Sequence, residues 1–359
     1  MDKVITIVGT RPELIRLSVL IKKLDEKYKN NHILVYTNQN YDYNLSTKFF
    51  EDLDIRKPNY FFKQVNNGFT EFLSNSFVEL GEIVEKEKPN KALILGDTNS
   101  GLLGLVLTKL GITVFHMEAG NRCYDNKVPE ETNRKIIDSF SKYNLPYTDI
   151  SKNNLIGEGF DKSYIYKTGN PILEVLNFYE DSINQSKILN CLNVTPKNYV
   201  LVTLHRSENV DNKNVLTEII DSINEISKEI KVVLSLHPRT KDKLNNFNIR
   251  LSGNVIVSKP FGFFDFVNLE KNSKLILTDS GTVQEEACIL HVPCVIIRDS
   301  TERFETIESG SAILSGVDKK NIIQSFTIAS SMNINWVVVN DYLVNNVSDV
   351  VLNILSGKK

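Results

Sequence analysis

The feature that most constrains this 359-residue chain is a regular alternation between short β-branched apolar runs and longer amphipathic segments. Such alternation is typical of βαβ units, in which parallel strands are joined by helices that cover a buried sheet. After the first run, residues 14–27 carry apolar side chains at helical spacing, which predicts an amphipathic helix. The predicted strands of this first series are residues 4–8, 32–37, 91–96, 112–117 and 144–149.

The alternation starts again after the Gly-Asn-Pro sequence at residues 169–171, which would interrupt a regular element. Because the chain exceeds the size at which one hydrophobic core usually stops growing, we predict an α/β protein of two Rossmann-like domains with parallel sheets. We place the domains at residues 1–169 and 170–345, and expect residues 346–359 to form a helix that crosses back to the first domain. The second series of predicted strands is 199–205, 231–237, 254–258, 274–279 and 292–298.

Charge and composition exclude several classes of function. A formal net charge of -2 gives no electrostatic reason to expect nucleic acid or an anionic membrane as a partner. No apolar stretch approaches the ~18–20 residues that span a bilayer, and residues 1–9 lack the long apolar region of a signal peptide. The four cysteines show neither a CxxC pair nor disulfide-framework spacing, which favours a reducing compartment and no structural zinc. We therefore expect a soluble cytoplasmic protein without a metal.

The segment after the first predicted strand, GTRPELIR at residues 9–16, indicates an anion site. Ligands of doubly wound sheets bind beyond the carboxyl ends of the strands. Gly9 permits a tight turn and Pro12 suits the first turn of a helix, so Arg11 and Arg16 would surround a helix start. The alternative is a capped helix with two surface arginines, and this motif alone leaves both interpretations open.

Carboxylates follow two more strands of the first series. Asp97 and Glu118 come directly after the strands at 91–96 and 112–117, and Glu130 lies on a loop shortly after. Carboxylates directed into one cleft raise each other's pKa and can serve as general acid and base. Taken singly, each also has a structural explanation: Asp97 as a helix cap, and the glutamates as salt-bridge partners of Arg122 or Arg134.

Two strands of the second series end in a histidine that an arginine soon follows. His205 precedes Arg206, and His237 lies two residues before Arg239. One histidine at such a place is usually buried and satisfied, whereas two with arginines suggest a rim that attracts anions.

The strand at 274–279 leads into SGTVQEEA, a turn of small residues that opens a helix. The backbone N–H groups at Ser280 and Gly281 could hold a diphosphate, and Glu286 could accept hydrogen bonds from ribose hydroxyls. The segment is neither GxGxxG nor a Walker loop, so NAD and ATP are not indicated and we expect no cofactor.

Eight segments between Gly9 and Arg303 together resemble the non-hydrolysing UDP-N-acetylglucosamine 2-epimerases in order and spacing. The resemblance implies a GT-B-like fold with the active site in the interdomain cleft, a homodimer, and cytoplasmic synthesis of a polysaccharide precursor. The segments are GTRPELIR, GDTNS, MEAGNR, PEETNR, HRSEN, HPRT, TDSGTVQEEA and RDSTER.

The same resemblance implies roles for individual residues. Asp97, Glu118 and Glu130 match the family's acidic catalytic positions, and His205 is expected to serve both catalysis and UDP binding. The implied UDP-binding positions are Arg11, Arg16, His205, Ser280, Gly281 and Arg303 at the diphosphate, Glu286 at the ribose, and Phe266 in the segment 263–266 beside uracil.

Three departures from the common pattern indicate a branch of the family. SGT replaces SGG at residues 280–282, the acidic loop is GNRCYDNKVPEE at 120–131, and YTNQNYDYNL at 36–45 replaces TGQH. These variants resemble the branch that makes UDP-N-acetyl-L-fucosamine from UDP-2-acetamido-2,6-dideoxy-L-talose for capsule or O-antigen. We expect the loop at Cys123 and Tyr124 to contact the C6 methyl group. The changed TGQH segment argues against the allosteric UDP-N-acetylglucosamine site that bacterial members build there.

The expected reaction follows from the chemistry of the sugar. The C2 proton has no adjacent carbonyl, so we expect UDP to leave C1 as this proton is removed, giving a 2-acetamidoglycal to which UDP adds back. The alternatives are a UDP-N-acetylglucosamine/UDP-N-acetylmannosamine 2-epimerase, a hydrolysing epimerase, a GT-B glycosyltransferase and a non-catalytic nucleotide-sugar sensor.

Overall fold

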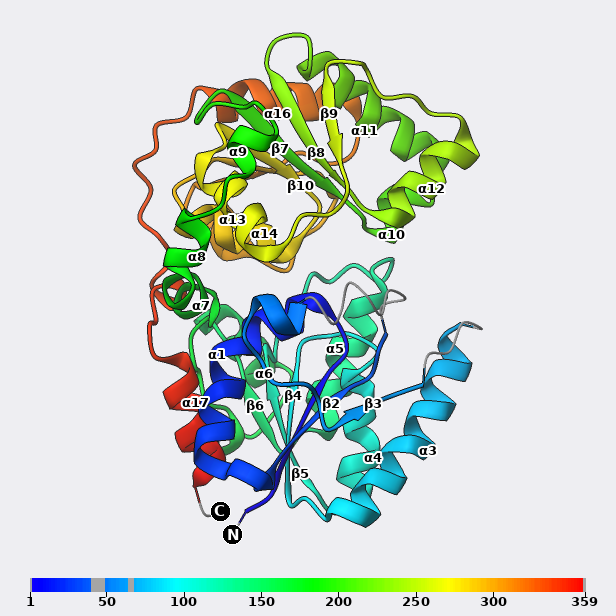
Figure 1. The fold of residues 1–359 in the computed structure, drawn as a ribbon, viewed down its shortest axis with the longest axis vertical. Coiled ribbons are helices and arrows are strands. Elements are labelled where there is room, and N and C mark those ends of the chain that lie inside the picture. The colour runs from blue at the N-terminus through cyan, green and yellow to red at the C-terminus, as the bar shows by residue number, and fades with distance from the viewer. Residues whose placement is uncertain (1, 40–48, 64–67, 358–359) are drawn as a thin grey trace. The chain divides into compact units, whose positions relative to one another are not determined.

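The computed structural model describes residues 2–39, 49–63 and 68–357, which form two compact α/β units (Figure 1). Unit 1 comprises Met1–Phe178 and Val344–Lys359, and unit 2 comprises Tyr179–Leu343. Each unit holds a six-stranded parallel sheet, which confirms the predicted fold class.

The sheet of unit 1 has the strand order β3-β2-β1-β4-β5-β6. Its central strand, β1, consists only of buried apolar and β-branched residues, as parallel strands covered on both faces require. In register, Val4 of β1 lies between His32 and Lys91. The strands are β1 Val4–Val8, β2 His32–Tyr36, β3 Tyr60–Phe61, β4 Lys91–Leu95, β5 Thr113–Met117 and β6 Tyr143–Leu145.

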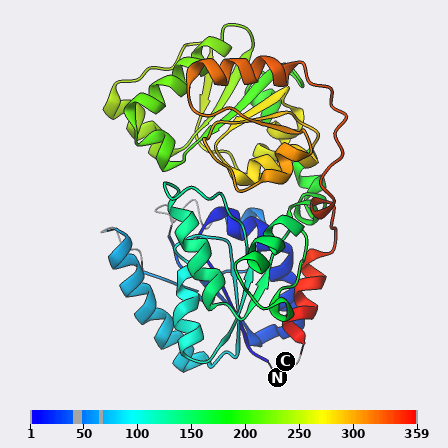
Figure 2. The same cartoon turned by 180° about the vertical axis from the view of Figure 1, so that it is seen from behind.

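Helices cover both faces of this sheet. Helices α3, α4 and α5 lie side by side on one face (Figure 2), over a core of apolar side chains from β1, β2, β4 and β5. Helix α1 packs against α7 and α17, so the C-terminal segment is part of unit 1. The helices are α1 Arg11–Tyr28, η1 Lys29–Asn31, α3 Phe69–Glu87, η2 Gly101–Leu103, α4 Gly104–Lys109, α5 Pro129–Phe140, α6 Asp149–Gly157, η3 Lys162–Tyr164, α7 Ile172–Phe178 and α17 Val347–Ser356.

The sheet of unit 2 has the order β12-β11-β10-β7-β8-β9. One core lies under α11 and α16, and a second core lies under α13 and α14 on the opposite face. The strands are β7 Tyr199–Leu204, β8 Lys231–Leu236, β9 Val255–Ser258, β10 Leu275–Thr278, β11 Cys294–Ile296 and β12 Ala312–Leu314. The helices are α8 Glu180–Asn184, α9 Ile188–Cys191, α10 Ser207–Val210, α11 Lys213–Ile226, α12 Pro238–Phe247, α13 Phe263–Asn272, α14 Gly281–Ile289, α15 Phe304–Glu308, α16 Lys319–Ser330 and η4 Asn340–Tyr342.

All ten predicted strands form, with three differences from the sequence-based expectations. The strand expected at 292–298 covers only Cys294–Ile296. The strand expected at 144–149 covers only Tyr143–Leu145, because Pro146 cannot donate to a ladder and Thr148 already caps helix α6. The edge strands β3 and β12 were not predicted, since they are only two and three residues long.

The chain passes between the units twice, at Phe178–Tyr179 and at Leu343–Val344. Residues 170–178, which the sequence-based division places in the second domain, form the last part of unit 1 before the first crossing. Gly169, with φ 84°, lies against the returning chain, since a Cβ added there would be 2.5 Å from Val344 Cγ2.

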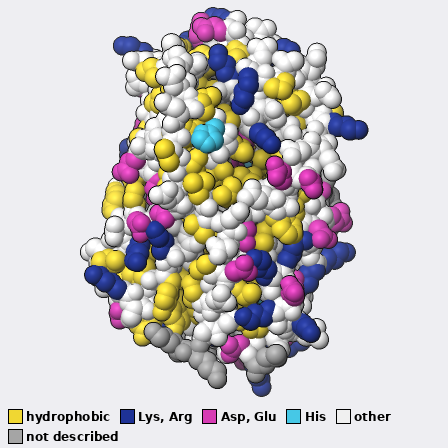
Figure 3. Space-filling view, turned by 90° about the vertical axis from the view of Figure 1, so that its left-hand side faces the viewer, with side chains coloured by type: hydrophobic (Ala, Val, Ile, Leu, Met, Phe, Trp, Pro, Cys, Tyr) yellow, Lys and Arg dark blue, Asp and Glu magenta, His cyan; other side chains and the backbone are white. Residues whose placement is uncertain are grey.

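Charges of both signs are interspersed with hydrophobic side chains on the face drawn in Figure 3. Within the residues that the structure describes, no helix is long and apolar enough to cross a membrane.

Candidate active site

Three neighbouring strands of unit 1, β1, β4 and β5, present their carboxyl ends at one edge of the sheet. The residues that follow them are the Gly9–Thr10 turn with the start of α1, Asp97, and Glu118. Because these strands are adjacent and parallel, the sheet gathers the residues predicted to bind and react at one place.

Glu118 has a positive φ of 67°, a backbone conformation that residues other than glycine rarely adopt. Its carboxylate accepts hydrogen bonds from Arg16 and, at 3.2 Å, from the Asn121 side chain. Both Glu118 and Arg16 are buried. Strained backbone of this kind persists where the surroundings impose it and is concentrated at functional sites.

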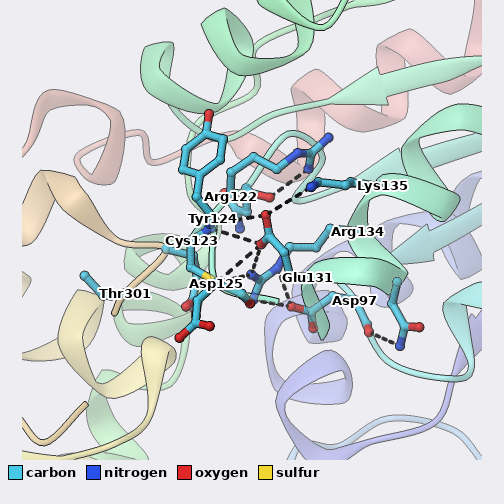
Figure 4. Close-up of polar contacts among 12 residues, drawn as sticks. Asp97, Arg122, Cys123, Tyr124, Asp125, Glu131, Arg134, Lys135 and Thr301 are labelled. Atoms are coloured by element: carbon cyan, nitrogen blue, oxygen red, sulfur yellow. Dashed lines mark hydrogen bonds and ion pairs between the residues drawn. The ribbon is translucent and has the colours of Figure 1, made fainter. Parts of the chain in front are cut away.

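Asp97 is held by an arginine from helix α5. Arg134 Nε and Nη2 each lie 2.8 Å from Asp97 Oδ2, while Arg134 Nη1 donates to Glu131 at 2.9 Å (Figure 4). Asn133 of the same helix donates to the Asp97 backbone carbonyl at 2.9 Å. Helix α5 therefore fixes both the side chain and the backbone of Asp97.

The two adjacent glutamates at the start of α5 have different surroundings. Glu131 is buried and accepts hydrogen bonds from the backbone N–H groups of Cys123 and Tyr124 (Figure 4). Burial acts to raise the pKa of Glu131, but the Cys123 N–H and Arg134 outweigh it, and the pKa lies below its ordinary value. Glu131 thus anchors the loop, whereas Glu130, the predicted catalytic residue, is half-buried.

Glu13 was not among the predicted site residues, yet it joins two parts of the site. Its carboxylate accepts hydrogen bonds from the N–H groups of Gly9 and Thr10 and from the Thr98 hydroxyl. Burial raises the pKa of Glu13 to about 7, against the opposing effect of these bonds. The capping-box spacing of Thr10 and Glu13 is the signal that could have found it.

The two predicted anion-binding arginines of unit 1 differ. The Arg11 guanidinium lies 4.4 Å from the centre of the Phe49 ring and is half-buried. Arg16 is engaged by Glu118 and lies 5.8 Å from the centre of the Tyr147 ring, so it is not a surface arginine. The capped helix, which is the alternative interpretation of the segment 9–16, does form, and Arg16 is one of its buried residues.

In unit 2, a buried aspartate organises the ends of β7 and β10. Asp279 accepts hydrogen bonds from the backbone N–H groups of His205 and Arg206, and His205 Nδ1 lies 3.1 Å from its carboxylate. Burial acts to raise the pKa of Asp279, but His205 and these N–H groups outweigh it and the pKa is lowered. His205 remains 38% exposed at its side chain, so its ring can contact a ligand.

His237 has a local structural role. Its Nδ1 accepts the Arg239 N–H at 3.2 Å and so caps helix α12, while Arg239 pairs with Asp211. The rings of His205 and His237 have their centres 5.7 Å apart, but the Arg239 guanidinium is already paired, and the rim that attracts anions stays a prediction.

Helix α14 begins at Gly281 after the N-cap residue Ser280. A Cβ added to Gly281 would lie 2.5 Å from Glu302 Oε1, so only glycine fits this helix start without a shift. Glu286 is buried one turn further on, and Arg303 forms an ion pair with buried Glu285.

Phe266 is half-buried on α13, whereas Phe263 of the same segment is buried in unit 2. The part of YTNQNYDYNL from residue 40 onward lies outside the described residues, as does the expectation about the allosteric site. All four cysteines are free, and within the described ranges no group of three or more His, Cys, Asp or Glu residues could hold a metal ion.

A family model described as UDP-N-acetylglucosamine 2-epimerase matches residues 22–356 of this chain. The chain belongs to the UDP-N-acetylglucosamine 2-epimerase family. A member from Methanocaldococcus jannaschii is 42% identical over 345 residues, covering 93% of this chain and 94% of the relative. The crystal structure of the M. jannaschii enzyme with UDP-GlcNAc and UDP superposes with a TM-score of 0.93 at 39% identity and covers 99% of both chains.

A further relative has a different sugar in its name. The UDP-2,3-diacetamido-2,3-dideoxy-D-glucuronate 2-epimerase of Pseudomonas aeruginosa is 36% identical over 327 residues, covering 90% of this chain and 91% of the relative. Membership of the UDP-N-acetylglucosamine 2-epimerase family makes this protein a non-hydrolysing isomerase that acts at C2 of a UDP-linked sugar.

Proposed function

We propose that the protein converts UDP-2-acetamido-2,6-dideoxy-L-talose to UDP-N-acetyl-L-fucosamine by eliminating UDP and adding it back. The observation that carries the proposed chemistry is the pair of carboxylates at neighbouring strand ends, Asp97 and Glu118, each bound by a buried arginine of its own unit. Two fixed carboxylates at one sheet edge are what proton removal and proton return at a single carbon require.

The proposed reaction is balanced without a cofactor. A carboxylate takes the C2 proton while the bond between C1 and the UDP oxygen breaks. The electron pair of the C1–O bond leaves with UDP, and the electron pair of the C2–H bond forms the C1–C2 double bond. UDP then attacks C1 again as C2 receives a proton from the opposite face. The charge that develops on the diphosphate is what backbone N–H groups and cations can stabilise.

We assign the proton transfers to Asp97, Glu118 and Glu130. Unit 2 supplies the nucleotide site, with the diphosphate at the start of α14 and at the half-exposed ring of His205, and with Glu286 at the ribose and Phe266 at uracil. Support comes from the start of α14, a nine-residue helix whose first turn is suited to an anion, and from the fixed backbone at His205.

The remaining predicted diphosphate ligands are Arg11, Arg16 and Arg303. Arg11 suits this role best, since the residue is only half-buried. Arg16 is paired with Glu118, and Arg303 is paired with Glu285. To contact the diphosphate, each arginine would have to bind its glutamate and a phosphate oxygen at the same time.

The loop after Glu118 carries the proposed preference for a 6-deoxy sugar. Tyr124 is 65% exposed, has φ 56°, and its hydroxyl donates to Asn154 at 3.0 Å. An aromatic ring held outward in this way could cover an apolar methyl group. If Tyr124→Ala keeps the wild-type ratio of kcat/KM for 6-deoxy over 6-hydroxy substrates, this assignment is wrong.

UDP-N-acetylglucosamine is the second candidate substrate, because relatives from M. jannaschii and Methanococcus maripaludis with 42% and 39% identity carry that name. The two candidates are separated by incubating the protein with each UDP-sugar in deuterated water and following C2 by NMR. We expect deuterium at C2, retention of the UDP linkage and a higher kcat/KM for the 6-deoxy-L-talose substrate. Faster turnover of UDP-N-acetylglucosamine would replace the substrate assignment, and a proton retained at C2 would refute the reaction.

We propose further that the protein works as a homodimer in the cytoplasm and supplies a precursor for capsule or O-antigen. Support for a second copy comes from apolar side chains exposed on the adjacent helices α3, α4 and α5, namely Val78, Leu105 and Ile136. Sedimentation of wild type and of Val78→Asp tests this: a dimer that the substitution weakens is expected, and a monomeric wild type would contradict it.

A further inference from the structure

His116, the fourth residue of strand β5, has no role in the reaction proposed above, although it is 1% exposed and lies beside the site. Its two ring nitrogens bind two different elements. Nδ1 lies 2.8 Å from Asp138 Oδ1 on helix α5, and Nε2 lies 2.9 Å from the carbonyl oxygen of Gly96 after β4. His116 therefore links the ends of two strands to one helix.

The partners of His116 fix its orientation. The Gly96 carbonyl can only accept a hydrogen bond, so the hydrogen of this bond lies on Nε2. Asp138, which faces Nδ1, is fully buried, accepts the Gly120 N–H at 3.1 Å and pairs with Arg122 at 2.8 Å. The ring is therefore fixed at both of its nitrogens.

The buried carboxylate that faces His116 is itself fixed from a third element. Arg122, which pairs with Asp138, also pairs at 2.6 Å with Glu158, an exposed residue that follows helix α6. His116 and Asp138 therefore belong to a network that joins β4, β5, α5 and the end of α6.

A second buried histidine of unit 1 shows that this arrangement is not general. His32 Nδ1 lies 2.6 Å from Asp25, but its Nε2 faces the Thr6 hydroxyl at 2.9 Å. A hydroxyl can donate as well as accept, so this contact does not place the hydrogen of His32 on Nε2. Burial lowers the pKa of His32, against the opposing effect of Asp25.

The elements that His116 and Asp138 join are the two that carry the proposed catalytic carboxylates. Gly96 directly precedes Asp97, and Gly120 follows Glu118 by two residues. We propose that His116, held between Asp138 and Gly96, is the positioning residue that keeps Asp97 and Glu118 in reacting geometry. This inference rests on the proposed function, in which those two carboxylates move the C2 proton.

Two substitutions of His116 each preserve one of its bonds. The asparagine amide reaches the place of Nδ1, so His116→Asn can still donate to Asp138 but not to Gly96. The glutamine amide reaches the place of Nε2, so His116→Gln can still donate to Gly96 but not to Asp138. We expect each to lower kcat by about 10- to 100-fold with KM within about twofold, because a displaced catalytic group loses rate while the substrate stays bound.

The matched control is His32→Asn. His32 is also a buried histidine that contacts a carboxylate, but it is the first residue of β2, whereas His116 lies near the carboxyl end of β5. It is expected to keep wild-type kcat. All variants are compared at a temperature where circular dichroism shows them folded. If both folded His116 variants keep kcat within about twofold of wild type, His116 has a structural role only and the inference is overturned.

Two further measurements keep the outcome decisive. The first measures deuterium incorporation at C2 by Asp97→Asn and Glu118→Gln. If these two variants still incorporate deuterium, the proposed function fails. If they lose the exchange but the His116 variants keep wild-type activity, only the inference about His116 is overturned. If the His116 variants do not fold, nitrogen-15 NMR of histidine-labelled wild type decides. We expect a one-bond proton coupling at His116 Nε2, which faces the Gly96 carbonyl, and an Nε2 without a bound hydrogen would contradict the inference.

Discussion

Glu13→Gln should make unit 1 more stable than wild type at alkaline pH but not at acid pH. Glu13 is buried, and burial raises its pKa from the ordinary 4.5 to about 7. For an acid with a raised pKa, the folded state binds more protons than the unfolded state between these two values, so stability falls as pH rises from 4.5 to about 7. At 1.36 kcal/mol per pH unit the loss is roughly 3 kcal/mol.

The glutamine variant lacks this titration. Below pH 4.5 protonated Glu13 and glutamine are isosteric, so the two proteins should have similar stability. Above pH 7 the variant avoids the cost of a buried carboxylate and should be more stable by roughly 3 kcal/mol, provided that its amide oxygen still accepts from Gly9.

Hydrogen exchange of the β1 and β4 amides, followed by mass spectrometry, reports the opening of unit 1 without that of unit 2. Wild type and Glu13→Gln are compared at several pH values, so that every other titrating group cancels in the difference. A difference in stability that stays constant from pH 4.5 to pH 8 would refute the assignment of a pKa near 7 to Glu13.

Two substitutions test the backbone and the buried charge behind the strand ends. Gly120→Ala places a Cβ 2.2 Å from the Ser151 carbonyl oxygen at φ 80°, so it should destabilise unit 1 by more than about 2 kcal/mol, measured by the same hydrogen exchange. Gly111→Ala, at φ 78° with open space around the added Cβ, is the control and should cost about 1 kcal/mol. Asp279→Asn should destabilise unit 2 by about 3 kcal/mol and weaken UDP binding, because the His205 ring and two N–H groups lose a charged acceptor. Fluorescence of the only tryptophan, Trp336 in unit 2, follows this unfolding, and unchanged stability and UDP affinity would contradict the role given to Asp279.

The two parallel sheets could be predicted because buried parallel strands need continuous apolar runs, and such runs can be recognised in a single sequence. The short edge strands β3 and β12 carry too few residues for such a run. Pro146 in the sequence marks the end of β6, although the predicted strand 144–149 continues past it.

Asp97, Glu118 and His205 do lie just after strands, yet the partners of the predicted site residues could not be inferred from spacing. Arg16 meets a glutamate 102 positions later, and Arg134 meets Asp97 from a different helix. Buried polar residues such as Glu13 and Asp279 look like ordinary helix or turn residues until the strands that they join are placed side by side.

The claim on which the account depends is that strand-end carboxylates of unit 1 drive departure of UDP by removing the C2 proton. Positional isotope exchange tests it directly, with oxygen-18 in the bridge between C1 and the β-phosphate. We predict that wild type moves the label to non-bridging positions, and that Asp97→Asn and Glu118→Gln lose this exchange while binding UDP with wild-type affinity. Undiminished scrambling in both variants would contradict the account.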